Sequence, residues 1–280
     1  MVRRAIFSLA CLLATAGAGT PLVACSPQFP VGGLPGRATE ITFPNRSAGG
    51  RHEYWAPAGA RMIMTAALAS ETAEYGHNIM GPLQDAKGLT IHISREGDSR
   101  VSCPAEVLLP EGEVFEDFAP RLADLDGDGM PEVIVVQSSL TKGARLAIYD
   151  RRARLLAATP YIGQSRRWLA PLGAADLDGD GAVEIAYIDR PHLARTLRVW
   201  RYRKGRLTEV ASASGLTNHR IGDTVITGGI RNCAEPPEIV TVNADWSRII
   251  ATRLVSGTLT SRDLGPYRAP ADIAKALACP

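Results

Sequence analysis

Two short acidic loops with the same spacing constrain this chain more than any other feature of its sequence. Residues 124–132 read DLDGDGMPE, and residues 176–184, which lie 52 positions later, read DLDGDGAVE. The four carboxylates of each loop repel one another unless a cation lies between them. Their hard oxygens suit Ca²⁺, which takes six to eight oxygen ligands. The repeated spacing therefore predicts a repeat protein with two calcium-binding loops and two bound calcium ions.

The residues that follow each loop distinguish between several families of acidic loop. In an EF-hand, the twelfth position is a bidentate Glu and a helix flanks the loop on each side. Here the twelfth positions are Val135 and Tyr187, and the loops lead into the β-branched and apolar runs EVIVVQS and EIAYID. Such runs are typical of buried strands. The sequence thus predicts an acidic loop followed directly by a strand, twice.

An acid at the ninth loop position followed at once by a strand resembles the FG-GAP/VCBS repeats, the blades of integrin-α-like β-propellers. The resemblance covers roughly residues 115–264, and the two loops carry it most clearly. It implies an all-β fold and a metal site in each loop, made of four carboxylates and one backbone carbonyl. The implied ligands are Asp124, Asp126, Asp128, Glu132 and the Met130 carbonyl in the first loop, and Asp176, Asp178, Asp180, Glu184 and the Ala182 carbonyl in the second.

Each loop belongs to a longer repeating unit. Both loop-and-strand segments are followed by an alternating strand, a polar turn and a second strand, at 144–160 and 196–212. The same hairpin pattern starts upstream at Gly88 and downstream at Ser247, without an acidic loop. We therefore predict an all-β, β-propeller-like array of about four units, of which the inner two carry metal. The final PADIAKALAC predicts a short C-terminal helix.

The two outer units differ from the inner ones. In the fourth unit, the residues before Glu238 read GGIRNCAEPP and contain no Asp, so we expect no metal there, and Cys233 occupies the degenerate loop. The first unit is more divergent. Its segment Tyr75-Gly-His77 is open to two interpretations, a ligand-facing element or a packed aromatic residue beside a hydrogen-bonded His, and we favour the second.

The N-terminus predicts export. Arg3 and Arg4 precede the apolar run 5–19, which is typical of a secretory signal peptide and short for a transmembrane helix. The segment that ends in Cys25, LVAC, is similar to a bacterial lipobox, whereas cleavage after Ala18 would release a soluble protein. We expect a periplasmic or outer-membrane lipoprotein, or alternatively a secreted soluble protein. A lipid anchor at Cys25 is the only membrane association that we expect.

Composition separates a Pro- and Gly-rich segment from the folded part of the chain. Residues 26–50 contain nine Pro or Gly and little periodicity, so we predict a signal peptide over 1–24 and a flexible tether over 25–56. Residues 57–280 are then a single propeller domain, long enough to bury its own core.

The cysteines leave two pairing schemes open. Lipidation of Cys25 leaves three cysteines in the mature chain, and cleavage after Ala18 leaves four, which permits two disulfides. Because export permits disulfides, we predict a bond between Cys233 and Cys279 that holds the terminal helix to the fourth unit. Two free, buried thiols are the alternative.

Charge and motifs point away from several functions. The formal net charge is +2 and the basic residues are scattered, which favours solvated surface charge over a polyanion-binding surface and predicts no nucleic-acid partner. The sequence contains none of G-x-S-x-G, H-E-x-x-H, the phosphate-binding loop or the dinucleotide fingerprint. We expect a non-catalytic binding or scaffolding module for a protein or glycan ligand. The alternative is a propeller hydrolase or lyase that acts on polysaccharide at an axial active site.

Overall fold

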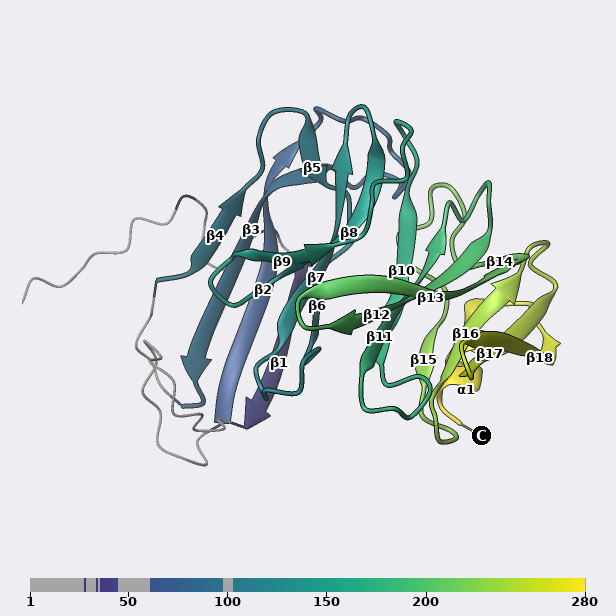
Figure 1. Ribbon diagram of the computed structural model, residues 1–280. Coiled ribbons are helices and arrows are strands. Elements are labelled where there is room, and N and C mark those ends of the chain that lie inside the picture. Colours follow the sequence, from purple (N-terminus) through teal and green to yellow (C-terminus); the bar gives the residue numbers. More distant parts are fainter. Residues whose placement is uncertain (1–27, 29–33, 35, 45–60, 98–102, 280) are drawn as a thin grey trace, which may run out of the picture.

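The computed structural model describes residues 28, 34, 36–44, 61–97 and 103–279, and strands dominate this part of the chain. The strands form three antiparallel sheets that follow one another along the sequence, and a short helix follows the last of them (Figure 1). The predicted signal peptide and lipobox lie outside the described residues. In the described part, no helix is long and apolar enough to cross a membrane.

The first sheet combines two units. Strands β1 to β4 form the first unit and strands β5 to β9 the second, and the pair Ala86–Phe115 joins β3 to β5. The bounds are β1 (Ala38–Pro44), β2 (Arg61–Thr72), β3 (Asp85–Arg95), β4 (Ala105–Leu108), β5 (Glu113–Phe115), β6 (Arg121–Ala123), β7 (Glu132–Ser139), β8 (Gly143–Tyr149) and β9 (Leu155–Ala158).

Strand β1 corrects the predicted tether. It pairs along its whole length with β2, from Ala38 opposite Ala67 to Pro44 opposite Arg61. Within it, Phe43 is buried and Ile41 packs against the same core, so the segment alternates as a half-buried strand should. The prediction of a flexible tether is therefore wrong for residues 38–44. The surrounding Pro and Gly residues masked this short alternating pattern.

The second and third sheets are one unit each. The second is a meander of β10 (Leu169–Ala175), β11 (Val183–Asp189), β12 (Thr196–Arg203) and β13 (Arg206–Ser214). The third contains β14 (Leu216–Thr217), β15 (Gly229–Arg231), β16 (Glu238–Asn243), β17 (Arg248–Val255) and β18 (Thr258–Pro266), and α1 (Pro270–Leu277) follows it. The prediction of an all-β, propeller-like array with a C-terminal helix is confirmed, with the difference that the first two units share a sheet.

The hydrophobic cores lie between consecutive sheets, as blades pack in a propeller. Ile134 and Leu146 of the first sheet share a buried cluster with Ile185 of the second. Leu197 of the second sheet shares another with Ile239 of the third. Helix α1 packs Ile273 and Ala276 against Val240 and Val242 of β16. Each sheet therefore buries its faces against its neighbours along the chain.

Loops of the first and fourth units also meet. The N–H of Gly222 donates to the Ile79 carbonyl at 3.2 Å. A Cβ at Gly81, where φ is +69°, would lie 2.8 Å from the Gly222 carbonyl oxygen, so only glycine allows this approach. Within the described residues, no strand pairing joins the first sheet to the third. The first and fourth units are thus in contact through these loops.

Candidate functional sites

The first acidic loop, between β6 and β7, gathers three carboxylates. Oxygens of Asp124, Asp126 and Glu132 lie within 4.8 Å of one another. The two carboxylate oxygens of Asp124 accept the N–H groups of Gly127 and Gly129, each at 2.9 Å. Oε2 of Glu132 accepts the N–H of Leu125 at 2.8 Å. These bonds fold the backbone around the carboxylates and hold them together.

The second acidic loop, between β10 and β11, repeats this geometry. Oxygens of Asp176, Asp178 and Glu184 lie within 4.8 Å of one another. Asp176 accepts the N–H groups of Gly179 and Gly181 at 2.7 and 2.9 Å, and Glu184 accepts the N–H of Leu177 at 2.8 Å. The 52-residue sequence repeat is therefore a structural repeat, and each cluster could hold a metal ion.

Two of the predicted carboxylates lie outside these clusters. Oδ1 of Asp128 accepts the N–H of Met130 at 2.7 Å, and Oδ1 of Asp180 accepts the N–H of Ala182 at 2.8 Å. Asp128 and Asp180 therefore form turns at the edge of each loop. Metal coordination by these two side chains and by the carbonyls of Met130 and Ala182 stays a prediction.

The residues of the first loop fit a cation. Burial, together with the neighbouring carboxylates of Asp126, Asp128 and Asp124, raises the pKa of Glu132 to about 8. The cross-strand register pairs Val133 with Tyr149, so the position opposite Glu132 is Asp150. Among the described residues, no Arg or Lys forms an ion pair with this loop. Three clustered oxygens without a basic partner suit a hard divalent ion.

The second loop differs because an arginine side chain from a neighbouring strand lies among its carboxylates. Arg201 of β12 lies opposite Glu184 in the strand ladder. Its Nε donates to Glu184 at 2.6 Å, its Nη1 lies 2.9 Å from Asp180, and its Nη2 donates to Asp178. The guanidinium therefore already neutralises carboxylates that would otherwise bind a metal ion. This loop fits a divalent ion less well than the first.

The fourth unit extends this trend. The position opposite Glu238 is Arg253, whose Nε donates to Oε1 at 2.7 Å. Arg231 occupies the place of Ala123 and Ala175 in the other units, and its Nη2 donates to Oε2 at 2.6 Å. The third partner of Glu238 is Arg262, at 2.9 Å. Three guanidinium groups thus surround the one acid that remains, and the metal-free prediction for this unit agrees with that arrangement.

A comparison with sequence families agrees with the loop geometry. The family model of the FG-GAP-like repeat matches residues 124–187, which contain both acidic loops. This chain carries an FG-GAP-like repeat. A search of curated proteins finds no match. Among solved structures, the exotype rhamnogalacturonan lyase YesX is similar, with a TM-score of 0.40 and 14% identity. The similarity covers 76% of this chain and 47% of the lyase chain, so it spans about half of that enzyme.

A hollow of about 250 Å³ lies at the ends of the strands opposite the acidic loops, and we call it the axial hollow. Residues of three of the four units line it. Strand β10, for example, starts beside the hollow after Trp168 and ends at the acidic loop that follows Ala175. The hollow is lined by His77, Ile79, Arg166, Arg167, Trp168, Arg190, Pro191, His192, Leu193 and Ile221. The second unit contributes Glu116, which does not line the hollow but is hydrogen-bonded to the lining residue His77.

A buried carboxylate fixes one wall of the axial hollow. Nδ1 of His77 lies 2.6 Å from Oε1 of Glu116, which is fully buried and also accepts a hydrogen bond from Ser138. Burial raises the pKa of Glu116, and the bond to His77 opposes that rise. Tyr75 is buried and packs edge-on against His77. The predicted packed aromatic and hydrogen-bonded His are confirmed, and His77 also lines the hollow.

His192, another lining residue of the axial hollow, is paired with His219. Nε2 of His219 lies 3.0 Å from the carbonyl of Asp223, so this nitrogen carries the proton and donates. Nδ1 of His219 then accepts from Nε2 of His192, 3.1 Å away. Burial, together with the neighbouring His219, lowers the pKa of His192 to about 4. The pair is therefore neutral at pH 7. No sequence motif pointed to it, because the two residues lie 27 positions apart.

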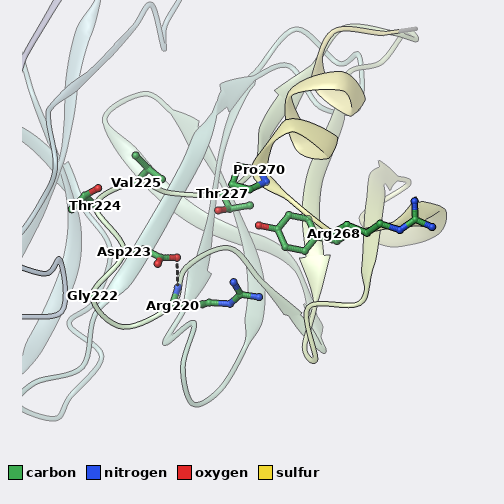
Figure 2. Close-up of a pocket in the computed structure, with 9 residues that line it drawn as sticks. Arg220, Gly222, Asp223, Thr224, Val225, Thr227, Arg268 and Pro270 are labelled. Carbon is green, nitrogen blue, oxygen red and sulfur yellow. Dashed lines mark hydrogen bonds between the residues drawn. The ribbon is translucent and has the colours of Figure 1, made fainter.

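A second hollow, of about 350 Å³, lies beside α1. Figure 2 shows Asp223, Thr227 and Arg220 around it, with the backbone N–H of Arg220 bonded to Asp223. The guanidinium of Arg220 lies 4.1 Å from the centre of the Trp246 ring. All of its lining residues belong to the fourth unit and the segment that leads into α1. It therefore lacks the contribution from several units that marks the axial hollow.

Proposed function

We propose that this protein is an exported, calcium-stabilised, β-propeller-like binding module whose ligand is a protein or a glycan. The observation that carries the proposal is the separation of its two kinds of site. The acidic loops lie at one end of the strands and fasten neighbouring strands together. The axial hollow lies at the other end, where loops of several units converge. Calcium then stabilises the fold, and the loops opposite it are left for a ligand.

Disulfide bonding supports the proposed export. Cys233 and Cys279 are bonded, with their Cα atoms 5.2 Å apart, and Cys103 is disulfide-bonded as well. Disulfides persist in oxidising compartments such as the periplasm and the cell exterior. The lipobox cysteine, Cys25, lies outside the described residues. Its lipidation would leave Cys103 without another cysteine of the mature chain to pair with, so the disulfides favour the secreted soluble form over the envelope lipoprotein.

A second candidate function, a hydrolase or lyase acting on polysaccharide, is favoured by one observation. The buried Glu116 orients His77 as a carboxylate orients the histidine of a general-base pair. Incubating the protein with polysaccharide and ester substrates and measuring released products separates the two functions. Turnover that disappears in His77→Gln would contradict the non-catalytic proposal, and binding without product would support it.

Calcium is expected to raise the melting temperature. Sites of this extracellular type bind with dissociation constants on the order of 10⁻⁴ to 10⁻³ M. At 10 to 100 times that concentration, one site stabilises the fold by about 1.4–2.7 kcal/mol. For a domain of this size, the melting temperature should rise by roughly 3–10 °C over the value in chelator. Thermal unfolding followed by circular dichroism measures this shift.

Magnesium is the control for this experiment, because it demands a tighter octahedral shell and dehydrates reluctantly. It should shift the melting temperature less than calcium does. Asp124→Asn, which removes a charge from the first cluster, should lose most of the calcium effect. A melting curve that does not respond to chelation would contradict calcium binding by these loops.

The two loops are expected to bind calcium unequally. Calcium can enter the second cluster only if Arg201 leaves its carboxylates, so we expect one stronger and one weaker site. Arg201→Gln should strengthen the weaker site, by tenfold or more if the lost guanidinium competition exceeds about 1.4 kcal/mol. Calorimetric titration measures both sites. The matched control is Arg198→Gln, on the same strand but paired with Asp189 and Glu209, away from the loop. Two equal sites in the wild type would contradict the expected inequality.

A further inference from the structure

We propose that the axial hollow binds a carboxylated sugar, an inference that rests on the proposed binding function and names its ligand class. Three features of the hollow favour this ligand: its charge, the hydrogen bonds of its two histidines and the shape of its walls. Each comes from residues that no acidic-loop motif includes.

The charge of the axial hollow is positive. Arg166, Arg167 and Arg190 line it, and no Asp or Glu is among its lining residues. Arg190 is held in a two-bond ion pair with Asp189, at 2.8 and 2.9 Å, which leaves two arginines as the excess charge. Arg167 uses one nitrogen to bond the Arg166 carbonyl at 3.0 Å. The planar guanidinium group suits a carboxylate, which it can bind through two parallel hydrogen bonds.

The two histidines add hydrogen-bonding nitrogens to the hollow. Nδ1 of His77 is bonded to Glu116, which leaves Nε2 for a ligand. Nε2 of His192 donates to His219, because His219 itself donates to the Asp223 carbonyl. A ring nitrogen beside two cationic donors matches a ligand that carries both hydroxyl groups and a carboxylate. A phosphate or a simple carboxylic acid would leave this nitrogen without a hydroxyl partner.

The walls and volume fit one sugar ring. Ile79, Trp168 and Pro191 form apolar walls, and Leu193 and Ile221 stand at the rim with exposed fractions of 64% and 70%. About 250 Å³ is below the range of roughly 300–1,000 Å³ that drug-sized ligands occupy. Bound peptides mostly use a sheet edge or an extended groove instead. A single ring at the end of an acidic glycan is the occupant that this hollow favours.

The loops around the hollow are also held in strained conformations. Asn78, Arg166 and Arg190 have positive φ values of 54°, 53° and 47°. Such backbone is costly for residues other than glycine and occurs preferentially at binding sites, where surrounding contacts hold it. One such contact is made by Arg166, whose N–H donates to the hydroxyl of the buried Tyr75 at 2.7 Å. The hollow is therefore built in advance rather than formed by the ligand.

The test is a calorimetric or NMR titration of the calcium-loaded protein with galacturonate and glucuronate. The matched neutral probes are the methyl esters of the same sugars, which keep the ring and its hydroxyls. We expect the uronates to bind at least tenfold more tightly than their esters. Arg166→Gln and Arg167→Gln should each reduce uronate affinity by fivefold or more. The control variant is Arg206→Gln, an exposed arginine at the start of β13, at the acidic-loop end.

Unchanged melting temperatures will show that the variants remain folded. Equal affinity for acid and ester, or uronate binding that is insensitive to both arginine variants, would overturn the proposal. A short peptide with a free C-terminal carboxylate that binds as tightly as the uronates would overturn it too. The outcome that contradicts the proposed non-catalytic function differs from the outcome that contradicts the uronate ligand. Binding of an intact glycan that survives in both variants would overturn this inference alone. Cleavage of a uronate-containing polysaccharide that is lost in both arginine variants would retain the hollow as the site and refute the non-catalytic role.

Discussion

Glu238→Gln is expected to lower the free energy of unfolding by roughly 2–3 kcal/mol at neutral pH. Glu238 is fully buried and is the shared acceptor of three arginines. Removing its charge leaves Arg231, which is 7% exposed, without a counter-ion in the interior. Breaking a fully buried pair costs about 3–5 kcal/mol. We expect less because Arg253 and Arg262 are 40% and 55% exposed, so water screens part of their charge.

This group also makes stability depend on pH. Burial alone would raise the pKa of Glu238, but hydrogen bonds from Arg262, Arg231 and Arg253 outweigh burial and lower the pKa to about 2. Its ordinary value is 4.5. Because the folded-state pKa is the lower one, the stabilisation is present above about pH 4.5 and is lost as pH falls toward 2. Glu238→Gln should lack this part of the acid dependence in urea unfolding.

The matched control is Asp263→Asn, which removes the Arg248–Asp263 ion pair in the same unit. Both side chains of that pair are nearly half-exposed, so we expect a change within about 0.5 kcal/mol. An equal loss in both variants would show that burial of the Glu238 network contributes nothing. A Glu238→Gln variant as stable as the wild type would contradict the assignment of Glu238 as the internal anion of the fourth unit.

The parts of the fold that depend on local pattern could be predicted from the sequence. The acidic spacing at 124–132 and 176–184 predicts two loops, and the structure builds both with the same backbone hydrogen bonds. The following apolar runs predict β7 and β11, and the hairpin patterns predict the four units. These signals are short-range, because loop and strand geometry depend on residues a few positions apart. Strand β1 was missed because a tether was inferred from composition rather than from alternation.

The arginines that neutralise Glu184 and Glu238 could not be predicted from the sequence, because they bond the acid from a neighbouring strand. Arg201 lies 17 positions after Glu184, and Arg253 lies 15 positions after Glu238. Only the strand register places each of them opposite the acid. A signal exists in retrospect: Ala123 and Ala175 precede the two acidic loops, and Arg231 replaces them in the fourth unit. The axial hollow has no such signal, since its residues are spread from His77 to Ile221.

The second, third and fourth units differ in how one buried Glu is neutralised. Among the described residues, the second unit offers no basic partner for Glu132, the third adds Arg201, and the fourth surrounds Glu238 with three arginines. The fixed charges of the fourth unit need no bound ion, but they also cannot fasten a loop through several ligands as a metal ion can. That loop instead contains Cys233, whose partner is Cys279 beyond α1. A covalent bond and an ion network thus stand where the second and third units have their acidic clusters.

Removing the Cys233–Cys279 bond is expected to be the most destabilising change considered for this protein. The predicted pairing is confirmed, and both cysteines lie at exposed positions rather than as buried thiols. A bond that spans 46 residues restricts the unfolded chain enough to contribute about 4 kcal/mol. Without it, α1 keeps the packing of Ile273 and Ala276 and the bond from Arg231 to the Ala276 carbonyl, at 2.8 Å.

The test is the double variant Cys233→Ser/Cys279→Ser, which leaves the disulfide of Cys103 intact, as chemical reduction would not. Urea unfolding should show a loss of about 3–4 kcal/mol, and hydrogen exchange should become faster in α1 before it does so in β16 and β17. The control is Ala234→Ser/Ala278→Ser, which adds the same hydroxyl groups beside each cysteine and keeps the bond. If the double cysteine variant unfolds like this control, the bond does not fasten the C-terminus, and the packing of α1 with the arginine network must hold it alone.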